Sequence, residues 1–227
     1  MIDSKIRAVL FDLDGTIIDT RKRFYLVFKE LLREFSSPSI DSVRFRELYS
    51  KNELDRILVG IKHKFLPEFL KRYQHFSVPS EKPLEGVKET LQTLKQDGFK
   101  IAIVTGRISP FEKVLLELAR HDLSQYVDVI VTKFSFIDSY PVNHLLWKIQ
   151  EIKEASSKLK VRPSECLFVG DHVYDILSGK AVGMLTVAVL TGGAQKEVLL
   201  SAQPDAIFEN ISSVLTYLKS IKSVNTS

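Results

Sequence analysis

The fold is decided by the stretch IRAVLFDLDGT, residues 6–16. Residues 6–11 form a short, mostly apolar run, and two aspartates and a glycine follow it directly. A short apolar run that is bounded by turn-forming residues predicts a strand buried on both faces. Asp12 and Asp14 then lie at the carboxyl end of that strand, where the glycine at position 15 lets the chain turn sharply.

Similar apolar runs recur along the chain and alternate with helical patterns. The predicted strands after the first lie at residues 99–104, 127–131, 166–169 and 184–189, with a weaker one at 205–208. The predicted helices lie at residues 86–96, 111–121, 142–159, 175–181 and 211–221. Strands that alternate with helices predict an α/β fold, with a mostly parallel sheet covered on both faces.

Residues 19–82 break this alternation. They contain helix-like stretches at residues 24–35, 41–49 and 61–73 but no convincing strand. We therefore expect two domains: a Rossmann-like parallel sheet core made of residues 1–18 and 83–227, and a small α-helical cap domain, residues 19–82, inserted after the first strand.

Composition limits the functional classes. The 227 residues are enough for one large domain with an insertion, and no apolar run is long enough to cross a bilayer. The single cysteine, Cys166, and a start without a signal-like leader predict a cytoplasmic protein. Residues 20–82 hold 14 Lys and Arg against 8 Asp and Glu. This basic excess is typical of a solvated surface or of a field that attracts anionic substrates, and no motif indicates nucleic acid.

Polar residues follow three of the predicted strands. They are Asp12 and Asp14 after the first strand, Thr105, Gly106 and Arg107 after the second, and Asp171 and Asp175 after the fourth. Ligands of open parallel sheets bind beyond the carboxyl ends of the strands, so we expect these residues to meet at one edge.

Their chemistry predicts phosphoryl transfer. Asp12 and Asp171 offer the oxygen ligands that Mg²⁺ prefers. A carboxylate can attack phosphorus to form an aspartyl-phosphate once a cation offsets the repulsion between the two anions. Asp14 is placed to protonate the leaving oxygen and then to activate water. The Thr105 hydroxyl and nearby backbone N–H groups can hold phosphate oxygens.

The same residues resemble three motifs of the haloacid dehalogenase-like superfamily. The motifs are DLDGT at residues 12–16, VTG at residues 104–106, and GD at residues 170–171 followed by Asp175. The flanking stretches 83–98 and 179–192 resemble the family as well, and phosphoglycolate phosphatase-like members most of all. The resemblance implies a helical cap of the first type, where residues 19–82 lie.

The resemblance also implies roles for individual residues. Asp12 is the nucleophile, and Asp14 is the acid and base. Magnesium is bound by Asp12, Asp171 and the Asp14 carbonyl, and Asp175 belongs to the same metal site. The second carboxylate, Asp14, is typical of phosphatases of the family and absent from its dehalogenases. A phosphomutase on the same core stays open as an alternative.

The third motif of the family departs from its usual form here. It is a lysine that opens the helix before the fourth strand, and by register that position holds Tyr140. Lys133 and Lys148 are the two candidates to replace it. If neither does, the chain is a catalytically weak phosphate-ligand binding protein.

We therefore predict a magnesium-dependent hydrolase of small phosphomonoesters. The expected partner is a small phosphorylated metabolite, without nucleic acid or membrane, and the chain is expected to be a monomer or a homodimer.

Overall fold

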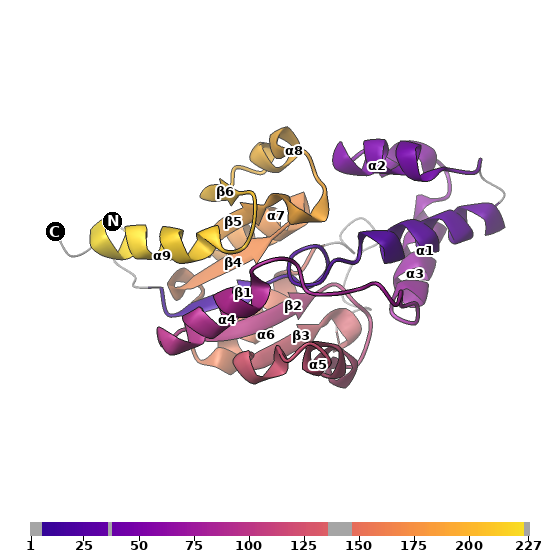
Figure 1. Ribbon diagram of the computed structural model, residues 1–227. Helices are drawn as coiled ribbons and strands as arrows, with labels where there is room; N and C mark the ends of the chain where they lie inside the picture. Colours follow the sequence, from indigo (N-terminus) through magenta and orange to yellow (C-terminus); the bar gives the residue numbers. More distant parts are fainter. Residues whose placement is uncertain (1–5, 36–37, 136–146, 225–227) are drawn as a thin grey trace.

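The computed structural model describes residues 6–35, 38–135 and 147–224. Its core is a parallel sheet in the strand order β3-β2-β1-β4-β5-β6 (Figure 1). The strands are β1 (Ala8–Phe11), β2 (Lys100–Thr105), β3 (Val129–Thr132), β4 (Cys166–Gly170), β5 (Leu185–Val189) and β6 (Ala206–Phe208). Each of them lies where the sequence predicted a strand, and the predicted α/β fold is confirmed.

Helices cover both faces of the sheet because alternate strand residues point to opposite sides. Val9 and Phe11 pack on one face, and Ala8 and Leu10 pack on the other. The first face is covered by α4 (Val87–Gln96), α5 (Phe111–Ala119) and α9 (Ser213–Val224). The second face is covered by α6 (Ile149–Leu159) and α7 (Val173–Val182), with α8 (Lys196–Ser201) beside α7.

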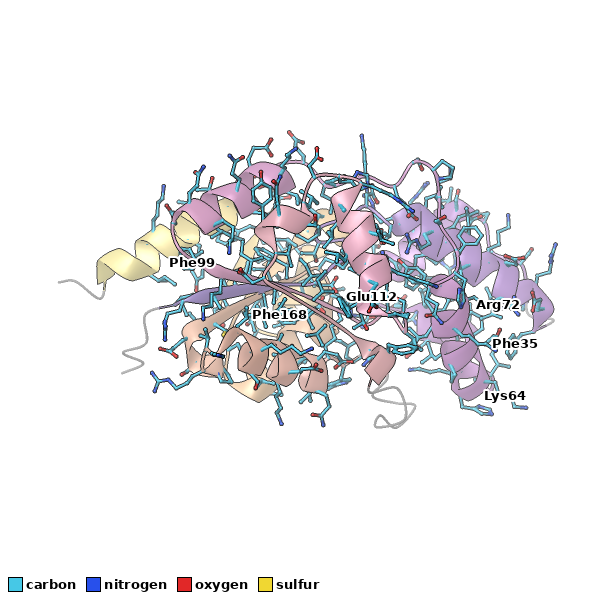
Figure 2. All side chains as sticks on the ribbon, turned by 90° about the horizontal axis from the view of Figure 1, so that it is seen from below. Phe35, Lys64, Arg72, Phe99, Glu112 and Phe168 are labelled. Atoms are coloured by element: carbon cyan, nitrogen blue, oxygen red, sulfur yellow. The ribbon has the colours of Figure 1, made fainter. Side chains whose placement is uncertain are left out.

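Three further helices lie between β1 and β2 in sequence, at the end of the molecule where the strands point (Figure 1). They are α1 (Arg21–Glu34), α2 (Ser42–Ser50) and α3 (Lys62–Tyr73). Figure 2 shows Phe35, Lys64 and Arg72 on this helical part and Phe168 within the sheet layers. The α1–α3 helices bury a cluster of their own, in which the rings of Phe24 and Phe69 lie 4.7 Å apart.

The chain leaves the sheet core and returns to it at one place. Ile18 and Pro83 form an antiparallel bridge, and the Asp19 N–H donates to the Lys82 carbonyl at 2.9 Å. These contacts agree with a boundary near residues 18 and 83, although the two-domain division itself stays a prediction.

One predicted helix starts later in the structure than in the prediction, and one short helix was not predicted. The helix predicted for residues 142–159 begins at Ile149, because the Lys148 N–H donates to the Ser178 hydroxyl at 3.0 Å and Lys148 is the residue that precedes the helix. Residues 142–146 lie outside the described residues. The short helix α8 was not predicted, since its six residues are too few to show a periodic pattern. Among the described residues, no helix has the length and apolarity needed to span a membrane.

Candidate active site

The register of the sheet brings three strand ends together. β1 lies between β2 and β4, with Phe11 opposite Ile103 on one side and Val169 on the other. The Asp12 N–H continues this pairing by donating to the Val169 carbonyl at 2.9 Å. The residues that follow β1, β2 and β4 therefore meet at one edge, as the sequence predicted.

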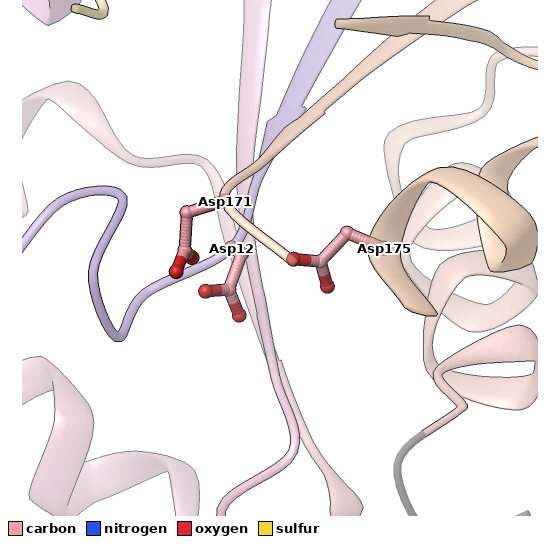
Figure 3. Close-up of side chains that lie close together, drawn as sticks. All are labelled: Asp12, Asp171 and Asp175. Carbon is pink, nitrogen blue, oxygen red and sulfur yellow. The ribbon is translucent and has the colours of Figure 1, made fainter. Parts of the chain in front are cut away.

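Three carboxylates gather at this edge. Asp12, Asp171 and Asp175 each place an oxygen within 4.8 Å of the others, and all three side chains are buried (Figure 3). The Thr16 hydroxyl donates to Asp171 Oδ1 at 2.9 Å and orients that carboxylate. A compact set of carboxylate oxygens is the donor set of a hard divalent cation such as Mg²⁺.

Two glycines make room for Asp171. A Cβ on Gly192 would lie 1.6 Å from Asp171 Oδ2, and one on Gly15 would lie 2.6 Å from the same atom. Gly15 also has a φ of +83°, which favours glycine over any residue with a side chain. Glycine at both positions is therefore required by the position of the carboxylate.

Lys148 lies among these carboxylates. Its Nζ donates to Asp12 Oδ1 and to Asp175 Oδ1, both at 2.5 Å. The sequence placed Lys148 two turns inside a helix, whereas the structure places it directly before α6. This is the position, at the start of the helix before the fourth strand, that the third motif of the resemblance occupies. Tyr140, the residue expected there by register, lies outside the described residues.

Lys133, the other candidate lysine, points elsewhere. Its fully buried Nζ donates to Glu151 Oε1 at 2.6 Å and to the Trp147 carbonyl at 2.7 Å. Since Trp147 immediately precedes Lys148, this contact fixes the backbone from which the Lys148 side chain extends. Lys133 thus supports the site from behind.

The charges of the cluster perturb one another. Burial raises the pKa of Asp12 to about 7 against the opposing charge of Lys148, and the charges of Asp175 and Asp14 add to the rise. Burial and the charges of Asp12 and Asp175 also hold the pKa of Asp171 well above its usual range. Burial lowers the pKa of Lys148, but the charges of Asp12 and Asp175 outweigh this effect and raise it overall. One ammonium group therefore does not balance three buried carboxylates.

Asp14 turns away from this cluster. Its carboxylate accepts hydrogen bonds from Arg107 Nε at 2.9 Å, from Arg107 Nη2 at 2.7 Å and from the Tyr73 hydroxyl at 2.9 Å. Burial alone would raise the pKa of Asp14, but the charge and hydrogen bonds of Arg107, with smaller effects of Arg23 and Tyr73, hold it far below its usual range. Asp14 is therefore a carboxylate in this arrangement.

The residues at the end of β2 and directly after it lie between the carboxylate cluster and Asp14. Thr105 is fully buried, and its hydroxyl lies 3.5 Å from Asp14 Oδ2 and accepts the Arg107 N–H at 3.2 Å. A Cβ on Gly106 would lie 3.7 Å from Lys148 Cε. All seven residues predicted for the site therefore lie at the same edge of the sheet.

Several residues of the site gave no signal in the sequence. Tyr73 comes from α3, and Glu117 of α5 pairs with Arg107. Arg23 of α1 pairs with Glu81 and lies 3.5 Å from Glu117. These side chains lie outside the three motifs, and the fold brings them around Asp14 and Arg107.

Known proteins share both the sequence and the fold. The family model described as haloacid dehalogenase-like hydrolase matches residues 9–189. Pyrophosphatase PpaX of Bacillus mycoides is 31% identical over 229 residues, which cover 96% of this chain and 99% of the relative. Phosphoglycolate phosphatase of Aquifex aeolicus is 32% identical over 199 residues, which cover 82% and 86% of the two chains.

A solved structure agrees with the fold. The haloacid dehalogenase-like family hydrolase of Streptococcus pneumoniae superposes with a TM-score of 0.73 at 21% identity and covers 96% of this chain and 99% of its own. The match to the family model extends over most of the described sheet core, and it includes every residue of the carboxylate cluster and the segment around Asp14. The chain therefore belongs to the haloacid dehalogenase-like hydrolase family.

Proposed function

We propose that this protein is a magnesium-dependent phosphatase that hydrolyses small phosphomonoesters through an aspartyl-phosphate on Asp12. The chain is a phosphatase of its family; the metal and the covalent step are the proposed parts. These parts are supported by the groups around Asp12. Lys148 Nζ lies 2.5 Å from Asp12 Oδ1, and the carboxylates of Asp171 and Asp175 are close enough to share one cation with Asp12. A nucleophilic carboxylate needs such positive charge to approach a phosphate.

The residues present fit a magnesium ion. Asp12 and Asp171 would hold it, with Asp175 beside them and the Asp14 carbonyl as the further ligand implied by the family resemblance. A divalent cation would offset the two negative charges that Lys148 leaves unbalanced among the three carboxylates. When bound, it would neutralise charge on the nucleophile and on the phosphoryl oxygens.

The side chains of the chain itself then supply the steps. An oxygen of Asp12 attacks phosphorus, the bond to the leaving oxygen breaks, and that oxygen takes a proton from Asp14. Water next gives a proton to the Asp14 carboxylate and attacks the same phosphorus, which frees phosphate and restores the Asp12 carboxylate. Lys148 stabilises negative charge throughout, and the Thr105 hydroxyl holds a phosphoryl oxygen.

Arg107 sets a condition on the first step. As a carboxylate paired with Arg107, Asp14 is ready to accept a proton from water but has none to give to a leaving group. Proton donation in the first step therefore requires the bound substrate to draw the Arg107 guanidinium away, so that Asp14 takes up a proton from solvent before the leaving oxygen departs. Anionic phosphoryl oxygens are a suitable competing acceptor.

A phosphoester panel tests the proposal. Purified protein with Mg²⁺ should release phosphate, and Asp12→Asn should reduce the release by at least roughly a thousandfold, as expected for loss of the nucleophile. The matched control is Asp97→Asn. Asp97 is exposed and directly follows α4, and this variant should keep full activity. Full activity of Asp12→Asn would refute the assignment, and formation of a sugar-phosphate isomer in place of phosphate would indicate a phosphomutase.

Pyrophosphate and phosphoglycolate belong in the same panel, because relatives of this chain carry those substrates in their names. The proposed natural partner is a small phosphorylated metabolite. We also propose a cytoplasmic location, in keeping with the free thiol of Cys166, and cell fractionation followed by immunodetection tests it.

A further inference from the structure

The carboxylate cluster forms one end of a cavity of about 190 Å³. At that end, Asp12, Asp14, Asp171 and Lys148 line it. Most of the remaining wall comes from α1–α3 and the segment between α2 and α3, and this part is largely apolar. Its lining includes Phe24, Tyr49, Leu54, Leu58, Phe69 and Leu70.

The apolar wall directly adjoins the reacting groups. The Tyr73 ring belongs to the wall, and its hydroxyl donates to Asp14 Oδ1 at 2.9 Å. On another side, the Gln195 N–H donates to the Ser50 carbonyl at 2.8 Å, which ties the end of α2 to the segment after β5. A phosphoryl group at Asp12 would therefore have its leaving group, on the side of Asp14, enclosed by this wall.

The cations of the lining are already paired with carboxylates. Arg21 pairs with Asp19 at 2.6 Å. Arg107 pairs with Asp14 at 2.7 Å and also with Glu117. Lys148 pairs with Asp12 and Asp175, as described above. In the proposed reaction Arg107 turns from Asp14 to the phosphoryl oxygens, so it serves the phosphate end of the substrate. Within the described residues, the lining offers no further Lys or Arg to an anionic group on the leaving side.

We infer that the substrate of this site is a phosphomonoester of a neutral, apolar alcohol with a carbon skeleton of about the size of a benzyl group. The inference rests on the proposed phosphatase function and adds the class of leaving group to it. Burial of an apolar group against aromatic and aliphatic side chains is energetically favourable. A cavity of about 150 Å³ lined by such residues accepts benzene. Because the cavity here must also hold the phosphoryl group, its volume sets a benzyl group as the upper limit for the apolar part.

This substrate class differs from the compounds in the relatives' names. Pyrophosphate and phosphoglycolate both carry a second anionic group next to the phosphoryl group that is removed. Here that second anion would lie against Phe24, Phe69 and Leu54, without a free counter-ion. Burial of an unpaired charge is strongly unfavourable, so this wall selects against both compounds.

Wild-type kinetics decide the inference. With Mg²⁺, we compare kcat/KM for benzyl phosphate, for 4-carboxybenzyl phosphate and for phosphoglycolate, with methyl phosphate as the reference that lacks the apolar group. Benzyl phosphate should exceed both anionic esters by roughly tenfold or more. Equal or faster hydrolysis of either anionic ester overturns the inference while leaving the phosphatase function intact. Hydrolysis of none of the four esters overturns the proposed function and the inference together.

A charge placed in the wall sharpens the test. Leu54 is half-buried and lines the cavity, whereas Val59, in the same segment, is 82% exposed and does not line it. Leu54→Lys should shift the ratio of 4-carboxybenzyl to benzyl phosphate by roughly tenfold toward the anionic ester, and Val59→Lys should leave the ratio unchanged. The same shift in both variants, or in neither, contradicts the assigned wall. The wild-type ratio stands by itself if Leu54→Lys fails to fold.

Discussion

Asp12 and Asp14 are the same residue type two positions apart, yet they lie in opposite electrostatic surroundings. Asp12 shares a buried pocket with Asp171 and Asp175, and its only cationic contact among the described residues is Lys148. Asp14 receives two hydrogen bonds from Arg107 and one from Tyr73. The pKa of Asp12 is accordingly raised to about 7, whereas that of Asp14 is lowered.

This difference separates the two halves of the proposed reaction. The surroundings of Asp12 are short of positive charge, so a further cation beside Lys148 would favour the anionic form of the nucleophile. The surroundings of Asp14 already balance its charge, so it is a carboxylate until the substrate displaces Arg107. Two carboxylates whose environments push their pKa values apart are typical of sites that divide nucleophilic and acid–base work.

Removal of the single cation beside Asp12 should have the largest effect. Lys148→Met keeps most of the side-chain volume but leaves Asp12 and Asp175 without their ammonium partner. We expect kcat to fall by roughly a thousandfold, in the range seen for loss of a preorganised electrostatic group. Steady-state assays on a phosphoester measure the change. A loss of less than about tenfold would show that Lys148 is not part of the reacting centre.

Lys133→Met removes the lysine behind the site instead. It removes the buried ion pair between Lys133 and Glu151, and we expect the free energy of unfolding to fall by about 3 kcal/mol, measured by urea denaturation. The loss in kcat should be smaller than for Lys148→Met, because Lys133 donates to Glu151 and to the Trp147 carbonyl, whereas Lys148 donates to Asp12 itself. Lys153→Met, at an exposed position of α6, is the control. A stable Lys133→Met variant that lost all activity would reverse the roles of the two lysines.

Arg107→Met breaks the charge balance around Asp14. We expect kcat/KM to fall by roughly a hundredfold, because methionine can replace neither the hydrogen bonds of Arg107 to Asp14 nor its proposed contact with the phosphoryl oxygens.

Stability should also respond to pH. The lowered pKa of Asp14 contributes stability above its unfolded value of about 4, and this contribution is lost as the pH falls toward the folded value. The difference in unfolding free energy between wild type and Arg107→Met should therefore shrink from about pH 6 to about pH 3. A constant or growing difference would show that Arg107 does not stabilise the Asp14 carboxylate.

Tyr73→Phe should have the smallest effect. It removes one hydroxyl that donates to Asp14 and keeps the ring in the cavity wall. A net loss of about 1 kcal/mol in stability, with a change of a few-fold in kcat, is expected for one hydrogen bond to a charged group that keeps its other donors. Thermal unfolding and steady-state assays measure both quantities. An effect as large as that of Arg107→Met would give Tyr73 a catalytic role that its geometry does not indicate.

The sequence predicted the parts of the site that lie on strand ends. Asp12, Asp14, Asp171 and Asp175 follow short apolar runs, and parallel strands that end at one edge necessarily bring such residues together. The sheet and most of its helices followed from the same alternation of patterns.

Other parts depend on contacts that no pattern reports. Lys148 was misplaced because the apolar periodicity extended upstream of the helix, which begins only at Ile149. Tyr73 reaches Asp14, and Glu117 reaches Arg107, from helices whose approach is set by packing. Their roles could be recognised only after the fold was known.

The most direct test of the central claim is chemical capture of the phosphorylated nucleophile. Borohydride reduces an acyl phosphate to the alcohol, so a phosphorylated aspartate is converted into homoserine, which mass spectrometry of proteolytic peptides locates. During turnover with Mg²⁺ we predict homoserine at position 12, dependent on substrate and absent when the metal is chelated. Homoserine at position 14 or elsewhere, or turnover without any reducible intermediate, would contradict nucleophilic attack by Asp12.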